Sequence, residues 1–218
     1  GAVRRDGEVV GIAVAVEGWS GYFPIAHEGG GNMDRGLVLD WFEELLQTTS
    51  TKIFHNAMYD VSWIRSLGFY INGGIVDTMI AASLIDENRF SYTLDAVGKD
   101  YIGMRKNENL LKEAAKDFGV NPKAEMWRLP APFVGEYAEK DAEMTLKLWH
   151  ALQHEITKQD LWDVFNLETN LFPCLVDMKF KGVRVDVQKA MSVKAQLQET
   201  EKKLLQDINK IAGFDVEI

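Results

Sequence analysis

The sequence predicts an α/β fold, in which a mixed sheet with flanking helices is followed by an extension that is mainly helical. Three observations predict it: Val- and Ile-rich runs lie early in the chain, a helix separates candidate strands, and helical periodicity dominates the later residues. Strands first and helices later are typical of a sheet domain with a helical continuation. We place the boundary near residue 155, giving domains at 1–154 and 155–218.

The strand candidates lie near the start of the chain. The apolar run Glu8–Val16, a glycine-containing turn and Tyr22–Ile25 predict an antiparallel hairpin. Helical spacing over Leu37–Leu46 is followed by a short apolar strand, Lys52–Phe54, after which helical periodicity resumes as far as Leu67.

Helices are predicted for most of the remaining chain. Apolar periodicity, with glycine or proline at several ends, indicates helices at Thr78–Ile85, Thr93–Tyr101, Asn109–Phe118, Pro132–His154, Leu161–Phe180 and Gln188–Ala212. Gly182–Asp186 interrupts the last two and is predicted to form a turn and a short strand.

The composition limits the classes of function. A net charge of −9 argues against a broad, sequence-independent grip on nucleic acid, which needs clustered Lys and Arg. An acidic chain can still bind phosphodiesters through metal ions. The single cysteine, Cys174, excludes an internal disulfide framework and a multi-cysteine zinc site, which suits a reducing cytoplasm, and we expect it to be buried. No signal peptide or membrane-spanning stretch is visible.

Two motifs could carry chemistry. Tyr137 and Asp141 are four residues apart, so a helix would place phenol and carboxylate on one face. Asp60 follows a strand near a helix start, where the helix dipole favours the ionised carboxylate, a suitable ligand for Mg²⁺. Each motif alone also fits a structural role, since Asp60 could be a helix-start residue and Tyr-x-x-x-Asp pairs occur by chance.

Together, the stretches Asn56–Asp60 (Asn-x-x-Tyr-Asp) and Tyr137–Asp141 (Tyr-x-x-x-Asp) resemble the second and third exonuclease motifs of the ribonuclease H-like proofreading exonucleases. The surrounding segments resemble phage and bacterial family A DNA polymerases at Val10–Val14, Tyr22–His27, Asp77–Met79 and Tyr92–Asp95. Gly182–Asp186 is similar to the start of the polymerase thumb, so the resemblance covers nearly the whole chain.

The resemblance implies a 3′→5′ exonuclease of the four-acid tyrosine subtype, which hydrolyses the 3′-terminal phosphodiester of DNA with two divalent ions, Mg²⁺ or Mn²⁺, and releases nucleoside monophosphates. It implies that Asp60 and Asp141 bind metal and that Tyr137 orients the attacking water. Asn56 would hold the terminal nucleotides, and Arg89 is a candidate phosphate contact.

The same resemblance implies the partners. They are the single-stranded 3′ end of DNA, primer–template DNA and a polymerase domain of the same parent chain, with a processivity factor as an option. The expected location is the cytoplasm of a bacterial cell or a phage-infected host.

The family's first motif, Asp-x-Glu on the opening central strand, is expected upstream of Gly1. The stretch Asp6-Gly7-Glu8 imitates it, but Asp-Gly before a strand is typical of a turn. We therefore expect a chain that is cut at both ends and lacks two of the four carboxylates and the first central strand, so that its own activity is doubtful. Two alternatives remain: an inactive structural or DNA-binding domain of a polymerase, and a free-standing exonuclease of the same superfamily.

Overall fold

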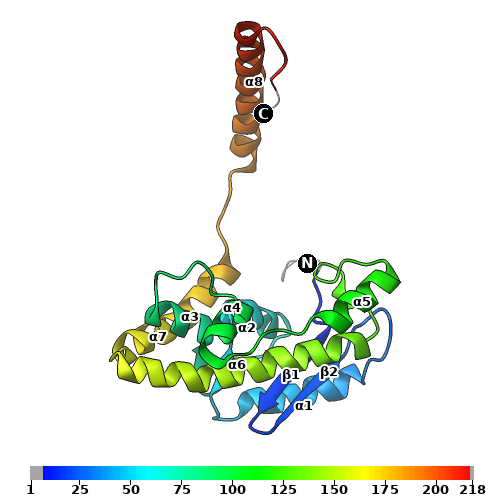
Figure 1. The fold of residues 1–218 in the computed structure, drawn as a ribbon, viewed down its shortest axis with the longest axis vertical. Helices are drawn as coiled ribbons and strands as arrows, with labels where there is room; N and C mark the ends of the chain where they lie inside the picture. Colours follow the sequence, from blue (N-terminus) through cyan, green and yellow to red (C-terminus); the bar gives the residue numbers. More distant parts are fainter. Residues whose placement is uncertain (1–6, 217–218) are drawn as a thin grey trace. The chain divides into compact units, whose positions relative to one another are not determined.

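The computed structural model describes residues 7–216, which divide into two compact units, one ending at Asp177 and one beginning at Met178 (Figure 1). The described strands are β1 (Gly11–Val16), β2 (Trp19–Pro24), β3 (Lys52–Phe54) and β4 (Ile75–Asp77). The described helices are α1 (Arg35–Gln47), α2 (Ala57–Ser66), α3 (Thr78–Ile85), α4 (Leu94–Ile102), α5 (Asn109–Phe118), η1 (Met126–Arg128, a 3₁₀ turn), α6 (Pro132–Lys158), α7 (Trp162–Lys181) and α8 (Val187–Ala212).

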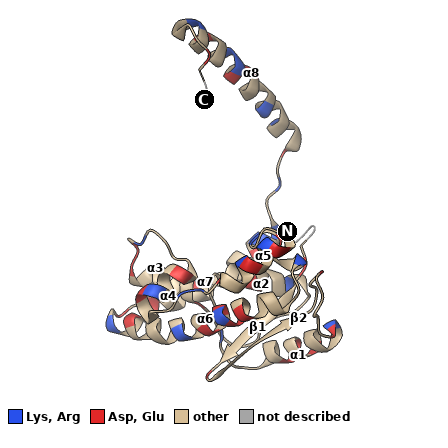
Figure 2. Ribbon diagram, turned by 45° about the vertical axis from the view of Figure 1, so that its right-hand side comes forward, with Lys and Arg blue, Asp and Glu red and all other residues tan. Residues whose placement is uncertain are grey.

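The antiparallel hairpin of β1 and β2 is a layer between two helices. Ile12 pairs with Phe23, and both pack into an apolar cluster that α1 completes with Val38 and Phe42. On the opposite face Tyr22 lies over α6, because successive side chains of a strand point to opposite sides. Neither strand carries a charged residue, as Figure 2 shows. The hairpin can therefore bury both faces.

The second pair of strands, β3 and β4, is parallel and is joined through α2. Ile53 pairs with Val76, and Phe54 with Asp77. Because the strands are parallel, their carboxyl ends lie at one edge, and α2 and α3 both start there. Edges of this kind are where α/β folds place functional residues.

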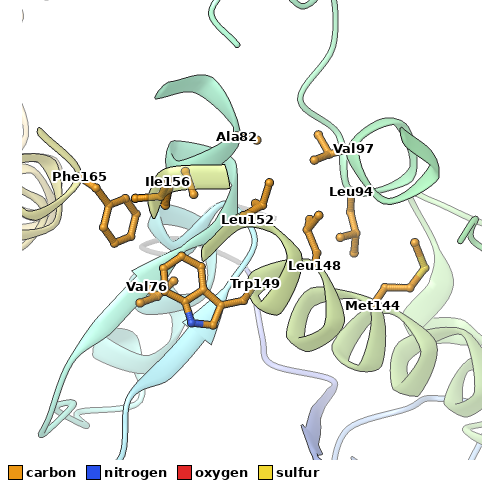
Figure 3. Packing of buried hydrophobic residues seen from close by; sticks show 11 residues of the cluster. Val76, Ala82, Leu94, Val97, Met144, Leu148, Trp149, Leu152, Ile156 and Phe165 are labelled. Carbon is orange, nitrogen blue, oxygen red and sulfur yellow. The ribbon is translucent and has the colours of Figure 1, made fainter. Parts of the chain in front are cut away.

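Helix α6 holds the first unit together, since it packs against β1, β2, α3, α4 and α5 (Figure 1). Leu148 and Leu152 on α6 are fully buried and meet Val97 of α4 and Ala82 of α3, as Figure 3 shows. Trp149 stacks on Phe165 of α7 with ring centroids 5.4 Å apart. The same helix carries Tyr137 and Asp141, so this core fixes their positions.

The predicted α/β class, the hairpin, the strand at Lys52–Phe54 and the later helices are confirmed. The structure adds β4, which the sequence reading had not separated from the apolar run that continues into α3. The short strand predicted at Gly182–Asp186 is wrong: the segment is irregular, and no described strand pairs with it. The boundary placed at 154/155 lies within α6.

Cys174 is exposed, and the expectation that it is buried is wrong. Helix α7 buries Phe172 and Val176, which are one turn apart on a single face. Cys174 lies midway between them in sequence and therefore points away from that face.

The second unit consists mainly of α8, whose start is capped by Asp186: its carboxylate accepts a hydrogen bond from the Lys189 N–H at 2.9 Å. No residue of α8 is buried. Within residues 7–216 no helix is both long and apolar enough to cross a membrane.

Candidate active site at the carboxyl edge of the parallel strands

Asp77 organises the edge at which β3 and β4 end. Its buried carboxylate accepts hydrogen bonds from the backbone N–H groups of Asn56 at 2.9 Å, Ala57 at 2.8 Å and Met79 at 2.9 Å. The first two amides open α2 and the third opens α3, and the first amides of a helix have no partner within the helix. One side chain therefore fixes the starts of both helices.

Asn56 and Asp60 lie at the start of α2. Asn56 adopts a left-handed backbone conformation, with φ 66° and ψ 56°, and its side chain is exposed. Burial raises the pKa of Asp60 to about 7, and the negative charge of Asp77 adds to the increase. The expectation that the helix dipole would favour the ionised form of Asp60 is outweighed here by desolvation.

Tyr137 and Asp141 lie on one face of α6, as their spacing predicts, and Lys106 joins them. The Lys106 ammonium donates to Asp141 Oδ2 at 2.6 Å and to the Tyr137 hydroxyl at 3.2 Å. It also lies 5.1 Å from the centre of the Tyr137 ring, within cation–π range. Burial raises the pKa of Asp141, although the Lys106 charge opposes that increase.

His55 directly follows β3, and both of its ring nitrogens lie within hydrogen-bond distance of a partner. One ring nitrogen is 2.8 Å from the Thr78 hydroxyl and the other is 2.9 Å from the carbonyl oxygen of Tyr92. Burial lowers its pKa, while the charges of Asp77 and Asp141 both act to raise it.

Arg89 is engaged elsewhere. Its guanidinium donates to Asp100 Oδ2 at 2.6 Å and lies 5.6 Å from the centre of the Tyr101 ring. Both partners belong to α4, and no contact joins Arg89 to the other candidate residues in the described structure. Its role as a phosphate contact stays a prediction.

The donors present fit a divalent cation in part. Asp141 Oδ1 is buried and has no hydrogen-bond partner, and Asp60 is a second carboxylate in a desolvated position. Carboxylate oxygens are the ligands that Mg²⁺ prefers. Within residues 7–216 there is no group of three or more His, Cys, Asp or Glu side chains that could hold an ion. Two carboxylates therefore supply only part of a ligand set.

The Asp6-Gly7-Glu8 stretch contributes nothing visible to this set. Asp6 lies outside the described residues, and Glu8 forms an exposed ion pair with Arg35 at 2.9 Å. His150 and His154, one turn apart, are both exposed on α6.

Sequence reasoning missed three residues of the site. Asp77 and His55 border recognised motifs, but the pattern did not indicate that Asp77 would cap two helices or that His55 would contact Thr78 and Tyr92. Lys106 lies in an irregular polar segment, and only the fold brings it to Asp141. Figure 2 shows both acidic and basic residues along α6.

Comparison with known proteins gives a consistent picture. A family model described as 3′-5′ exonuclease matches residues 5–157. A DNA-directed DNA polymerase of Pseudomonas phage M6 is 36% identical, with 100% of this chain and 34% of the relative covered. DNA polymerase I of Synechocystis sp. is 25% identical, with 82% of this chain and 18% of the relative covered. The chain thus spans about a third of the phage relative's length.

Two solved structures share the fold. One, described as the POL domain of Pol1 from M. smegmatis in complex with DNA primer-template and dNTP, aligns with a TM-score of 0.63 at 17% identity, covering 95% of this chain and 32% of that one. The other, described as the apo form of the nuclease, aligns with a TM-score of 0.56 at 16% identity, covering 76% of this chain and 72% of that one.

Proposed function

Because the chain belongs to the 3′→5′ exonuclease family of family A DNA polymerases, a family that depends on divalent metal ions, we propose that it is a proofreading unit. It would remove mispaired nucleotides from the 3′ end of a DNA primer and release nucleoside monophosphates. Phage and bacterial DNA polymerases among its relatives support this role, and they support a parent polymerase that works in a bacterial cell or a phage-infected host.

The observation that carries the proposal is Asp141 Oδ1, a buried carboxylate oxygen with no hydrogen-bond partner, on the helix that also carries Tyr137. Such an oxygen is costly to bury unless a cation or donor reaches it. Two divalent ions, Mg²⁺ or Mn²⁺, would activate a water and stabilise the leaving oxygen when bound. Asp60 and Asp141 would hold them, with further ligands from outside residues 7–216.

The remaining candidates would act on the substrate. Tyr137, with its hydroxyl directed at the Asp141 region, would orient the attacking water. Asn56, exposed at the start of α2, would hold the terminal nucleotides. Arg89 would contact a phosphate only after exchanging its partner Asp100 for the DNA. The partners proposed are the single-stranded 3′ end and primer–template DNA, together with a polymerase domain and, where the parent has one, a processivity factor.

Two observations favour a second candidate, an inactive domain that keeps the exonuclease fold for structural or DNA-binding purposes. Lys106 already neutralises Asp141 at 2.6 Å, and residues 7–216 hold no cluster of three acidic or metal-binding side chains. In that case the Lys106–Asp141 pair would be a permanent ion pair in the fold.

Degradation of a 3′-labelled single-stranded DNA with Mg²⁺ decides between the two. We would compare the chain, a form extended upstream of Gly1, Asp141→Asn, and the exposed control Asp117→Asn. Removing a metal ligand removes several kcal/mol of charge stabilisation in the transition state. The rate of DNA degradation should therefore fall by about 100-fold or more. A folded extended form that degrades no DNA would refute the proofreading role. If Asp141→Asn abolishes DNA degradation and Asp117→Asn does not, the result supports that role.

A further inference from the structure

Lys106 is placed at Asp141 by the backbone around it. It lies in the irregular segment between α4 and α5, and its own N–H donates to Asp95 Oδ1 in the first turn of α4 at 2.9 Å. The backbone is thus anchored while the long side chain reaches across to α6. An ammonium on a flexible four-carbon stem can change partners without movement of the chain.

The ammonium has a second acceptor within reach. Besides Asp141 Oδ2 it contacts the Tyr137 hydroxyl at 3.2 Å and faces the Tyr137 ring. If a competing cation took over Asp141, Lys106 would keep these contacts with Tyr137. The Lys106 ammonium would therefore still have a partner after it left the Asp141 carboxylate.

Asp141 is only half satisfied by Lys106. Its Oδ1 is buried without a hydrogen bond, while Oδ2 carries the whole ion pair. The side chains of Lys106 and Asp141 are only 20% and 26% exposed, so their attraction is less screened than that of a surface pair. The Oδ1 of Asp141 therefore lacks a partner that a harder, doubly charged ion could supply.

We propose that Lys106 is a displaceable internal cation, which neutralises Asp141 until a divalent ion binds that carboxylate and then remains with Tyr137 alone. Lys106 would thereby set the metal concentration at which the site loads, and act as a positioning residue for Tyr137. The inference rests on the proposed function, because it needs a metal ion at Asp141.

The test is direct binding of Mn²⁺, read from the electron paramagnetic resonance signal of the free ion, with no DNA present. The proteins are the whole chain and its Lys106→Met, Lys106→Gln, Lys106→Arg and Asp141→Asn variants. Lys140→Met is the matched control, because Lys140 adjoins Asp141 in sequence but pairs with Glu143 at 3.0 Å. Circular dichroism identifies any variant that fails to fold, and two neutral replacements guard against that outcome.

We expect both neutral variants to bind Mn²⁺ roughly 10-fold more tightly, since the ion no longer displaces a charge-assisted hydrogen bond. Lys106→Arg keeps the charge and should stay within roughly threefold of the parent chain. Lys140→Met should bind like the parent chain.

Equal or weaker binding by the folded neutral variants, including no measurable binding by any protein, overturns the inference. If Asp141→Asn abolishes binding and DNA degradation while the Lys106 variants bind like the parent chain, the proposed function stands and the inference about Lys106 falls. If Asp141→Asn binds Mn²⁺ unchanged, the ion lies elsewhere and both are wrong.

Discussion

Removal of the Asp77 carboxylate should destabilise the chain more than removal of any exposed helix cap. Asp77→Ala takes the acceptor from three backbone amides, those of Asn56, Ala57 and Met79. Each buried donor left without a partner costs about 1–3 kcal/mol. Because α2 and α3 can relax and water can enter, we expect the free energy of unfolding to fall by about 3–5 kcal/mol, at the upper end for single substitutions.

Urea unfolding followed by circular dichroism measures this loss, and thermal unfolding should show a midpoint lower by about 10 °C for a chain of this size. Asp34 provides a matched comparison, because it caps α1 through one amide, that of Leu37 at 2.9 Å, in an exposed position. Asp34→Ala should cost about 1 kcal/mol. The exposed Asp40, in the same helix, should tolerate Asp40→Ala within about 0.5 kcal/mol.

The order of the three losses is the prediction. If Asp77→Ala costs no more than Asp34→Ala, the three amides do not depend on the carboxylate, and the account of how β4 fixes the starts of α2 and α3 is wrong. An equal decrease in the free energy of unfolding in all three variants would contradict it as well.

Three other predictions concern stability. Burial raises the pKa of Asp60 in the folded chain to about 7, well above the usual range for a carboxyl group. Without metal, the chain should therefore lose stability as pH rises from about 4 to 7. Asp60→Asn should flatten this trend and gain on the order of 1 kcal/mol or more at pH 8, as measured by urea unfolding at pH 5 and 8. Leu152→Ala should cost about 2–5 kcal/mol by chemical denaturation, whereas Leu37→Ala, at a residue 72% exposed, should cost little; similar losses would contradict the core assignment. Gly73→Ala should lower the midpoint of thermal unfolding more than Gly18→Ala does. Both glycines have positive φ, but only at Gly73 would the new Cβ lie 2.7 Å from backbone oxygens. Equal decreases would mean that backbone conformation alone, and not this close contact, destabilises both variants.

The catalytic candidates were visible in sequence because they lie in short local motifs. Tyr137 and Asp141 are four residues apart, and a helix brings such residues to one face whatever surrounds it. The hairpin and most helix ends were visible for the same reason, since turns, caps and apolar periodicity act over a few residues. The strand β4 was hidden because its three residues merge into the apolar start of α3.

Local patterns could not show which charges meet across the fold. Lys106 and Asp141 are 35 residues apart in sequence, and only the packing of α4 and α6 brings them within 2.6 Å. The pKa of Asp60 also depends on distant contacts, because a helix start favours the ion while burial, which depends on the whole unit, favours the neutral acid. The sequence by itself determined the hairpin, most of the helices and the chemical groups they carry. Tertiary structure alone decided how deeply those groups are buried and which charges face them, since both depend on contacts between distant segments.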